Sequence, residues 1–242
     1  MKYNIIGDIH SRKNWRELVD PSWINIFVGD YFSPYFPYPF YKQEEEFLKI
    51  TEFARAYPDN VILLIGNHDE DHWHIQEHYS RFDEENVGEI VQLFEESKDL
   101  FNAAYSIENK ILVTHAGVTK SWFNKYCENS NINPDDIAKS INHLWLSGKY
   151  RAFDFYHNSN RWDFYGVSEQ HGPLWIRSES LCSNNVFKGT NFIQVVGHTQ
   201  FPNIIPFPRD GVIFVDVLGY TSESLLYDSE SDKFSVNKGI FE

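Results

Sequence analysis

A carboxylate and an imidazole stand two residues apart near the start of the chain, in the segment GDIH at residues 7–10. The apolar-leaning run before them, residues 2–6, is predicted to be a buried strand that ends at a glycine. Because alternate residues of an extended segment point to the same side, Asp8 and His10 can share one target. A carboxylate and a neutral imidazole at this spacing suit a divalent transition metal.

Four more strand-like segments end in residues of the same kind. These residues are Asp30 in GD, Asn67, His68 and Asp69 in GNHD, His115 in HAG, and His198 in GH. In α/β sheets, ligands bind at the carboxyl ends of strands, where glycine lets the backbone turn sharply. Each residue alone has an ordinary explanation, such as a turn or a buried, hydrogen-bonded histidine. Five such strand ends in one chain favour a shared site instead.

Alternating strands and helices must position these ends. Strands are predicted at residues 2–6, 23–28, 60–65, 103–107, 110–114, 192–196, 212–217, 224–227 and 234–236, with a tight turn at 108–109. Helices are predicted at residues 43–57, 87–98 and 134–147. The last has Asn133 as a capping residue and Pro134 at its first position. No linker or internal repeat interrupts the pattern, so we expect one α/β domain over residues 1–242.

Two stretches are harder to assign. Residues 31–41 contain three prolines, which exclude regular structure, and many aromatic side chains. They form either a packed surface loop or an aromatic rim beside the site. Residues 149–191 are aromatic-rich and irregular. Three histidines follow GNHD and either line the cleft or, as we expect, are solvated in a loop or helix: His72, His74 and His78.

Composition excludes several classes of protein. The formal net charge of -14 argues against a nucleic-acid backbone as the main partner, because phosphate backbones are bound by an excess of Lys and Arg. No run approaches the ~20 apolar residues of a membrane span, and no signal peptide opens the chain. Cys127 and Cys182 lie outside any metal-type spacing and are expected to be reduced. The expected location is the cytoplasm.

The motifs GDIH, GDY, GNHD, HAG and GHT follow one another across residues 7–199. In them the chain resembles the calcineurin-like metallophosphoesterases, within their phosphoprotein-phosphatase branch. The resemblance implies an αββα fold, with two mixed β-sheets packed as a sandwich and flanked by helices. It also implies that His68 donates a proton to the leaving group and that Asp69 hydrogen-bonds within the site.

The resemblance further implies a two-metal centre. Its ligands would be Asp8 and His10 on the first ion, Asp30 bridging both ions, and Asn67, His115 and His198 on the second. Two cations roughly 3.5–4 Å apart can share a nucleophilic hydroxide and clamp the ester oxygens. Asp30 can bridge because a carboxylate offers two oxygens. The mixed ligand set suits manganese first, with iron or zinc as alternatives, better than calcium.

The chain departs from the branch where phosphate is bound. GDY continues as FSP, whereas the branch has VDRG, so an Asp that orients the proton donor and an Arg that grips phosphate are missing. Ser33 is a weak, neutral substitute that could hydrogen-bond His68. Ile65 stands where many members have another arginine. Phosphate binding must then come mainly from the metals and from arginines elsewhere.

Arg177 is the first candidate for such an arginine. It ends the segment GPLWIR, residues 172–177, which resembles a GP-x-W-x-R stretch of some bacterial-type members. Its guanidinium suits bidentate contact with an oxyanion, although an ordinary salt-bridged arginine has the same sequence signature. Arg12, just after GDIHS, is the second candidate.

Three hypotheses about function follow. The first is a metal-dependent phosphatase acting on phosphomonoesters, either phosphoproteins or small phosphorylated metabolites. The second is a nucleotide phosphodiesterase or dinucleoside polyphosphate hydrolase, since the aromatic residues at 31–41 could stack a nucleobase. The third is a metal-containing binding module without turnover, which the missing Asp-Arg pair suggests.

Overall fold

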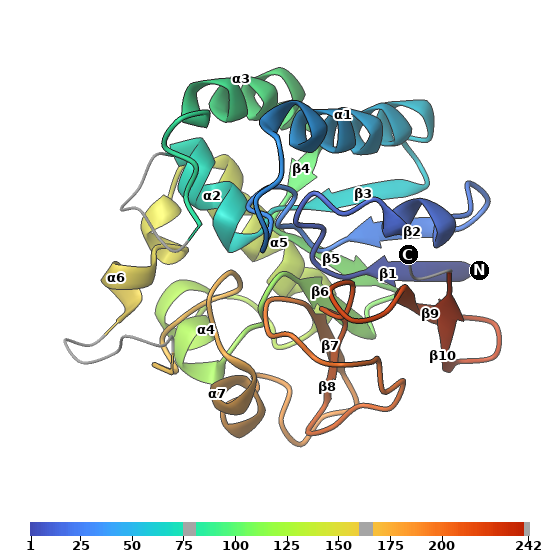
Figure 1. The fold of residues 1–242 in the computed structure, drawn as a ribbon. Helices are drawn as coiled ribbons and strands as arrows, with labels where there is room; N and C mark the ends of the chain where they lie inside the picture. Colours follow the sequence, from blue (N-terminus) through green and yellow to red (C-terminus); the bar gives the residue numbers. More distant parts are fainter. Residues whose placement is uncertain (75–80, 160–166, 240–242) are drawn as a thin grey trace.

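The computed structural model describes residues 1–74, 81–159 and 167–239, and these form two β-sheets with helices around them (Figure 1). The first sheet has the order β10 (Lys233–Lys238), β9 (Glu223–Asp228), β1 (Lys2–Ile6), β2 (Ile24–Phe27), β3 (Val61–Leu64), β4 (Phe101–Asn102). The second has the order β5 (Ala104–Ile107), β6 (Ile111–Thr114), β7 (Ile193–Val196), β8 (Val212–Phe214). The predicted fold class, two mixed sheets flanked by helices, is confirmed.

The strands that carry the motifs are parallel. In the first sheet β1, β2, β3 and β4 pair in parallel, and β9 and β10 are antiparallel additions. In the second sheet β6, β7 and β8 pair in parallel, and only β5 is antiparallel. Parallel strands end at the same edge of their sheet, so residues that follow several strands are gathered in one place.

The two sheets pack face to face through one hydrophobic cluster. Alternate residues of β1, Tyr3 and Ile5, lie in that cluster together with Val113 of β6 and Val195 of β7. Ile6 points to the other face, where it belongs to the helix-covered core. The motif strands are therefore apolar on both faces, as expected for strands buried between two layers.

Helices cover the outer faces of the sandwich (Figure 1). They are α1 (Phe40–Ala56), α2 (Asn67–His74), α3 (Val87–Ser97), α4 (Lys120–Tyr126), α5 (Pro134–Leu146), α6 (Phe155–Asn158) and α7 (Ser178–Ser183), with 3₁₀ turns at Asn14–Glu17, Lys98–Leu100 and Tyr150–Ala152. Phe47 of α1 and Phe94 of α3 lie in the core with β2 and β3, and Leu181 of α7 packs against Val196 of β7. No helix in the described ranges is both long and apolar enough to traverse a bilayer.

Several local predictions are confirmed. Asn133 caps α5 by accepting a hydrogen bond from the amide of Asp136, with Pro134 at the first position. The turn between β5 and β6 has Glu108 and Asn109 at φ 50° and 51°, the backbone of a tight hairpin turn. Cys127 and Cys182 are both free thiols.

Other local predictions are wrong. The α2 helix begins at Asn67 of GNHD, which places His72 one turn after His68. His72 is completely buried, its Nδ1 lies 2.6 Å from the His68 carbonyl oxygen, and its ring stacks on Phe82. It is therefore not solvated, and His74 is also largely covered. His78 falls outside the described residues.

Candidate metal centre

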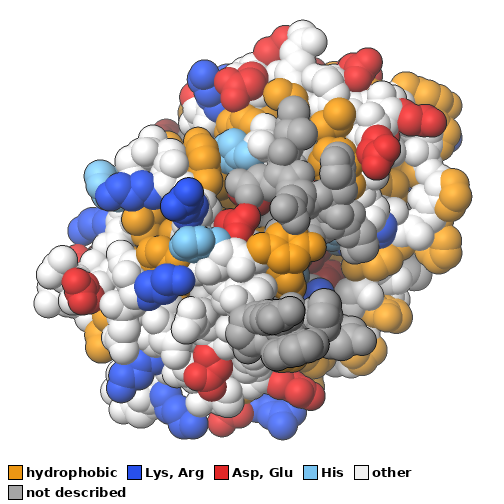
Figure 2. Space-filling view, turned by 90° about the vertical axis from the view of Figure 1, so that its left-hand side faces the viewer, with side chains coloured by type: hydrophobic (Ala, Val, Ile, Leu, Met, Phe, Trp, Pro, Cys, Tyr) orange, Lys and Arg blue, Asp and Glu red, His pale blue; other side chains and the backbone are white. Residues whose placement is uncertain are grey.

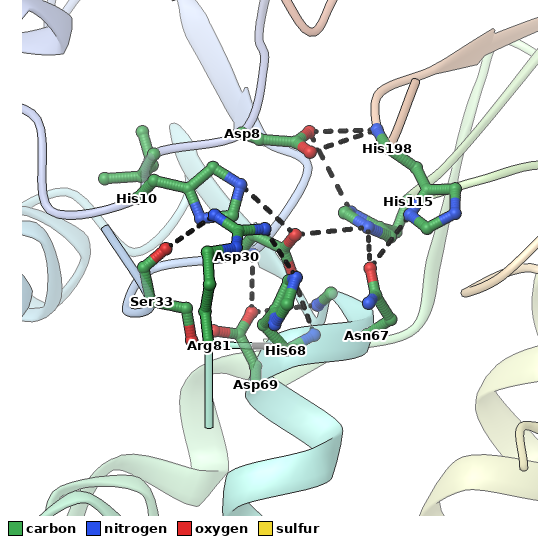
Figure 3. A network of polar contacts seen from close by, with 12 residues as sticks. Asp8, His10, Asp30, Ser33, Asn67, His68, Asp69, Arg81, His115 and His198 are labelled. Atoms are coloured by element: carbon green, nitrogen blue, oxygen red, sulfur yellow. Dashed lines mark hydrogen bonds and ion pairs between the residues drawn. The ribbon is translucent and has the colours of Figure 1, made fainter. Parts of the chain in front are cut away.

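The candidate ligands meet at the carboxyl ends of strands from both sheets. Figure 3 shows them pointing toward one another: Asp8 and His10 follow β1, Asp30 follows β2, Asn67 follows β3, His115 follows β6 and His198 follows β7. All six side chains are buried, between 0 and 8% exposed. We call these six residues the ligand cluster.

Asp8, His10 and Asp30 form the first group within this cluster. One ligand atom from each lies within 4.8 Å of the others. The Nδ1 of His10 is 3.0 Å from the carbonyl oxygen of Phe32, so it carries the ring proton. The Nε2 lone pair is then directed at Asp30 Oδ2, 3.5 Å away.

Asn67, His115 and His198 form the second group. Asn67 Oδ1 lies 2.8 Å from His115 Nε2 and 2.9 Å from His198 Nδ1. His115 Nδ1 is 2.9 Å from the Val28 carbonyl oxygen and carries the proton, so its Nε2 also presents a lone pair inward. The same Nε2 is 3.6 Å from Asp30 Oδ2. Asp30 thus faces both groups, and several acceptor atoms converge where a cation would satisfy them all.

The backbone at the strand ends leaves little freedom. His10, Asp30 and His198 have φ of 45°, 56° and 61°, a left-handed conformation that costs energy for residues other than glycine and concentrates at functional sites. A Cβ on Gly197 would lie 2.1 Å from Asp8 Oδ1, and one on Gly66 would lie 2.2 Å from Asp30 Oδ1. Glycine is required at both positions because a carboxylate of the cluster occupies that space.

Asp69 ties two strand ends together. Its carboxylate accepts hydrogen bonds from the amides of Asp30 (2.6 Å), Tyr31 (2.8 Å) and Gly66 (2.9 Å). These amides belong to the turns after β2 and β3. The side chain therefore fixes the backbone beneath the cluster.

Burial shifts the pKa values of the titratable residues in and beside the ligand cluster. It raises the pKa of Asp30 to about 7 and the pKa of Asp69 to about 8, and it raises the pKa of Asp8 as well. It lowers the pKa of His115 to about 3 and holds the pKa of His198 well below its usual value. Neutral imidazoles are ready to bind a metal, and a divalent cation would stabilise the ionised carboxylates that burial disfavours. The donor set, mixed oxygen and nitrogen, fits a divalent transition metal.

Asp216 belongs to this site but carries no motif in the sequence. It follows β8, is 1% exposed, and its carboxylate faces that of Asp8, with which it shares a hydrogen bond and whose pKa its charge raises. Burial raises its pKa to about 7, and the charges of Asp30 and Arg12 act on it in opposite directions. Without a preceding glycine, this strand end was not recognised.

Arg81 is the second residue that sequence reasoning missed. Its Nη2 lies 2.7 Å from His68 Nε2, and its Nη1 donates to the Ser33 carbonyl oxygen at 2.8 Å. The guanidinium also covers the Tyr35 ring, 3.8 Å from the ring centroid. Because a guanidinium can only donate, His68 Nε2 accepts, and the imidazole is neutral. Burial, followed by the charges of His10 and Arg81, keeps the pKa of His68 well below its usual value.

The expected hydrogen bond from Ser33 to His68 is not formed. Ser33 Oγ is buried and has no partner in the described part of the chain. The backbone of Ser33 contributes instead, since its carbonyl oxygen holds Arg81. The arginine thus stands where an Asp was expected to orient His68.

The two arginines proposed from the sequence lie in different places. Arg177, just before α7, lines a hollow of about 80 Å³ together with Tyr35, Arg81 and every residue of the ligand cluster except His115. It donates to the His198 carbonyl oxygen at 3.3 Å. Arg12 donates to the carbonyl oxygens of Asp8 and Ile9 and is not among the residues that line this hollow. We call Tyr35, Arg81 and Arg177 the rim. Figure 2 views the side toward which the strands point in Figure 1, and basic, acidic and histidine side chains are interspersed on it.

Comparison with known proteins agrees with this geometry. The model of the calcineurin-like phosphoesterase family matches residues 1–209. No curated protein sequence matches the chain. The family requires divalent metal ions, which is consistent with the ligand cluster.

Solved structures share the fold at low sequence identity. A cold-active protein-tyrosine phosphatase from the psychrophile Shewanella sp. superposes with a TM-score of 0.60 at 16% identity, covering 97% of this chain and 80% of that one. A protein serine/threonine phosphatase from Saccharomyces cerevisiae superposes with a TM-score of 0.53 at 13% identity, covering 99% and 80%. At such identities these similarities establish the fold alone.

Proposed function

The chain belongs to the calcineurin-like phosphoesterases, and we propose that it hydrolyses phosphomonoesters at a two-metal centre. One observation carries the proposal: ligand atoms of six buried residues converge in two groups, both facing the Asp30 carboxylate. In the proposal Asp8, His10 and Asp30 hold one ion. The second ion is held by Asp30 together with Asn67, His115 and His198.

Manganese is the ion we propose, with iron or zinc as alternatives, because imidazole and carboxylate ligands together suit these metals. Such a pair of ions supplies water of lowered pKa and neutralises charge on the ester oxygens. The residues of the chain must do the rest: bind the phosphoryl group, orient it and supply a proton to the leaving oxygen.

Arg81 and Arg177 are the phosphoryl-binding residues in this proposal. Both line the small hollow together with five of the six residues of the ligand cluster. A guanidinium binds two phosphate oxygens at once, which favours arginine for this role. The phosphoryl group of a monoester has three non-bridging oxygens to share among metals and arginines, whereas a diester has two. Two arginines at one small hollow therefore favour monoesters.

His68 is the proton donor in this proposal, and it can donate through Nε2 only after Arg81 has moved away from that atom. An imidazole that accepts from a guanidinium cannot donate through the same nitrogen. We expect an incoming phosphoryl group to draw Arg81 away from His68 Nε2, which removes a repelling cation and adds an anion nearby. Both changes raise the pKa of the imidazole toward the range useful for general acid catalysis.

Substrates of the proposed reaction are phosphorylated small molecules or phosphoproteins, and a cytoplasmic location stays a prediction of the sequence. The test compares kcat/KM of the manganese-loaded protein for para-nitrophenyl phosphate and bis-para-nitrophenyl phosphate. Bound metal is counted by inductively coupled plasma mass spectrometry. We expect two ions per chain and a kcat/KM at least about tenfold higher for the monoester, one tenfold step being about 1.4 kcal/mol of transition-state stabilisation.

A higher kcat/KM for the diester would identify a phosphodiesterase instead. Turnover of neither ester by protein that holds two ions would identify a binding module. Protein stripped with a chelator and assayed without added metal is the control, and it should hydrolyse neither ester.

A further inference from the structure

A larger hollow of about 490 Å³ adjoins the ligand cluster. Its lining includes His10 and Tyr35, which also line the small hollow of the candidate metal centre. A molecule whose phosphoryl group lies at the ligand cluster can therefore extend past Tyr35 into this second space. Pockets of roughly 300–1,000 Å³ hold whole drug-sized ligands, so the hollow has room for more than a single ring.

Aromatic side chains form one wall of the hollow. Tyr35, Phe36 and Tyr38 come from the proline-rich segment after β2, and Leu218 adds a further apolar surface. Phe36 is 82% exposed, so its ring is accessible to a ligand in the hollow. The Tyr35 ring is held by guanidinium groups, with Arg12 at 5.3 Å and Arg81 at 3.8 Å from its centroid. A wall of this kind suits stacking with a planar ring.

Positive charge surrounds the same space. Among the residues that the structure describes, Arg12, Lys13 and Arg16 line it beside one acidic residue, Glu17. The Arg16 guanidinium pairs with Glu46, while the Arg12 guanidinium donates to main-chain oxygens. Because Glu46 offsets the charge of Arg16, the positive charge at the hollow comes mainly from Arg12 and Lys13. Their field favours a ligand that carries negative charge beyond the phosphoryl group at the metals.

We propose that this hollow binds the leaving group of the substrate, and that the leaving group is a nucleoside carrying a second phosphate. The proposal rests on the proposed function, because the phosphoryl group to be hydrolysed must lie at the ligand cluster. In the reaction the ester P–O bond breaks, water adds to phosphorus, and the leaving oxygen takes a proton. The products are inorganic phosphate and a nucleoside monophosphate.

Size and charge favour this occupant over a phosphorylated peptide side chain. A serine leaving group has no ring to place against Tyr35 and Phe36. A tyrosine ring is attached directly to the phosphoryl oxygen, so it reaches Tyr35 but carries no second anion toward Lys13 and Arg16. A nucleoside phosphate places a ring on the aromatic wall and an anion beside the basic side chains.

The experiment measures kcat/KM of the manganese-loaded protein for three monoesters: adenosine 3′,5′-bisphosphate, adenosine 5′-monophosphate and glycerol 3-phosphate. We expect kcat/KM to fall in that order, by about tenfold when the ring is lost, in line with the loss of one base–aromatic stack. Equal values for the adenosine monophosphate and glycerol phosphate would overturn the proposal. So would a phosphotyrosine peptide that is hydrolysed with a higher kcat/KM than the bisphosphate.

Two exposed lining residues provide the variants. Phe36→Ala should lower the bisphosphate-to-glycerol-phosphate ratio of kcat/KM by about tenfold, and Lys13→Ala should lower the bisphosphate-to-monophosphate ratio by about threefold to tenfold. Matched controls are Phe207→Ala, which removes a 72%-exposed ring that lines another hollow, and Lys139→Ala, which removes an exposed cation. The controls should leave both ratios unchanged. Ratios that stay constant in the lining variants would contradict the assignment.

Failure of the proposed function can be told apart from failure of this inference. If no monoester is hydrolysed, the proposed function fails, and calorimetric binding of adenosine 3′,5′-bisphosphate to the metal-loaded protein decides about the hollow. Binding that is tighter than that of glycerol 3-phosphate and weakened by Phe36→Ala would support the hollow as a nucleoside site. Equal binding of the two ligands would overturn it.

Discussion

The ligand cluster and the rim face the same small hollow but are built in different ways. Cluster residues follow sheet strands within a few positions, and main-chain groups hold them: Asp8 accepts the amide of His198 at 3.1 Å, and His115 bonds the Val28 carbonyl. The rim arginines come from segments outside the strands and reach the site with the tips of long side chains. Main-chain contacts thus fix the proposed metal ligands, whereas we expect the long side chains of the rim to adjust to a substrate.

Replacing Asp30 with Asn should have the largest effect, because both groups of the cluster share its carboxylate. We expect loss of bound metal and a fall in kcat/KM of more than about 100-fold, beyond the 10–100-fold typical of side chains that only support a ligand. Metal analysis and para-nitrophenyl phosphate hydrolysis measure both. Asp99→Asn, at an exposed position, is the control. Normal metal content in Asp30→Asn would remove Asp30 from the centre.

Gly197→Ala tests whether metal binding depends on the position of Asp8. The added methyl group would lie 2.1 Å from Asp8 Oδ1 and 2.8 Å from Val28, so Asp8 must move. We expect metal affinity to fall by about 10–100-fold, as for other disturbances of ligand position. Gly88→Ala is the matched control, since a Cβ there meets nothing within 4 Å. Equal metal affinity in both variants would show that the cluster tolerates displacement.

Arg81→Ala probes the rim alone. Loss of a charged hydrogen-bond donor to the phosphoryl group should lower kcat/KM by about tenfold or more, while metal content stays normal. Arg55→Ala, which removes an exposed arginine paired with Asp99, is the control. A simultaneous loss of metal would show that the rim and the cluster are not independent.

The smallest predicted effect is on stability against pH in metal-free protein. Between pH 6.5 and 8.5 the carboxylates of the unfolded chain are ionised, and its histidines, with a pKa of about 6.5, lose only their remaining protons. The folded chain at pH 6.5 still holds protons on Asp30 and Asp216, with a pKa of about 7 each, and on Asp69, with a pKa of about 8. The free energy of unfolding therefore falls as pH rises from 6.5 to 8.5. Below this window the buried neutral histidines act in the opposite direction, because the unfolded chain then gains protons.

Thermal unfolding of chelator-treated protein at pH 6.5 and 8.5 measures this effect. Tm should be lower at pH 8.5, and added manganese should recover it, since metal binds only the folded cluster. Asp216→Asn should reduce the dependence on pH. A Tm that rises between these two pH values would contradict the assigned protonation of the cluster.

The difference between the ligand cluster and the rim also explains which site residues could be predicted from the sequence. Cluster residues lie at fixed offsets from glycines at strand ends, so the parallel arrangement of β1, β2 and β3 brings them together. The α5 helix and the hairpin turn at 108–109 were predictable because capping and turn residues act locally. Where the spacing signal was weaker, as at Val215-Asp216, the strand-end carboxylate was missed.

Arg81 could not be predicted, because its position depends on how the chain between α2 and α3 returns to the site. Sequence spacing fixes neither that path nor the partner at its end. His72 was misjudged for a related reason: its burial follows from the start of α2 at Asn67, and the sequence DEDHWH alone is polar enough to suggest an exposed helix or loop. Long-range packing, rather than local propensity, decided both cases.

The hydrogen bonds of the Asp69 carboxylate have a consequence for the removal and replacement of metal. Because a side chain of the chain itself ties the turns after β2 and β3 through the amides of Asp30, Tyr31 and Gly66, no ion is needed to hold these turns in place. After chelation we expect the two turns to keep their conformation, so that the site can bind metal again. If the site binds metal as proposed, we expect the folded protein to exchange one divalent ion for another without unfolding.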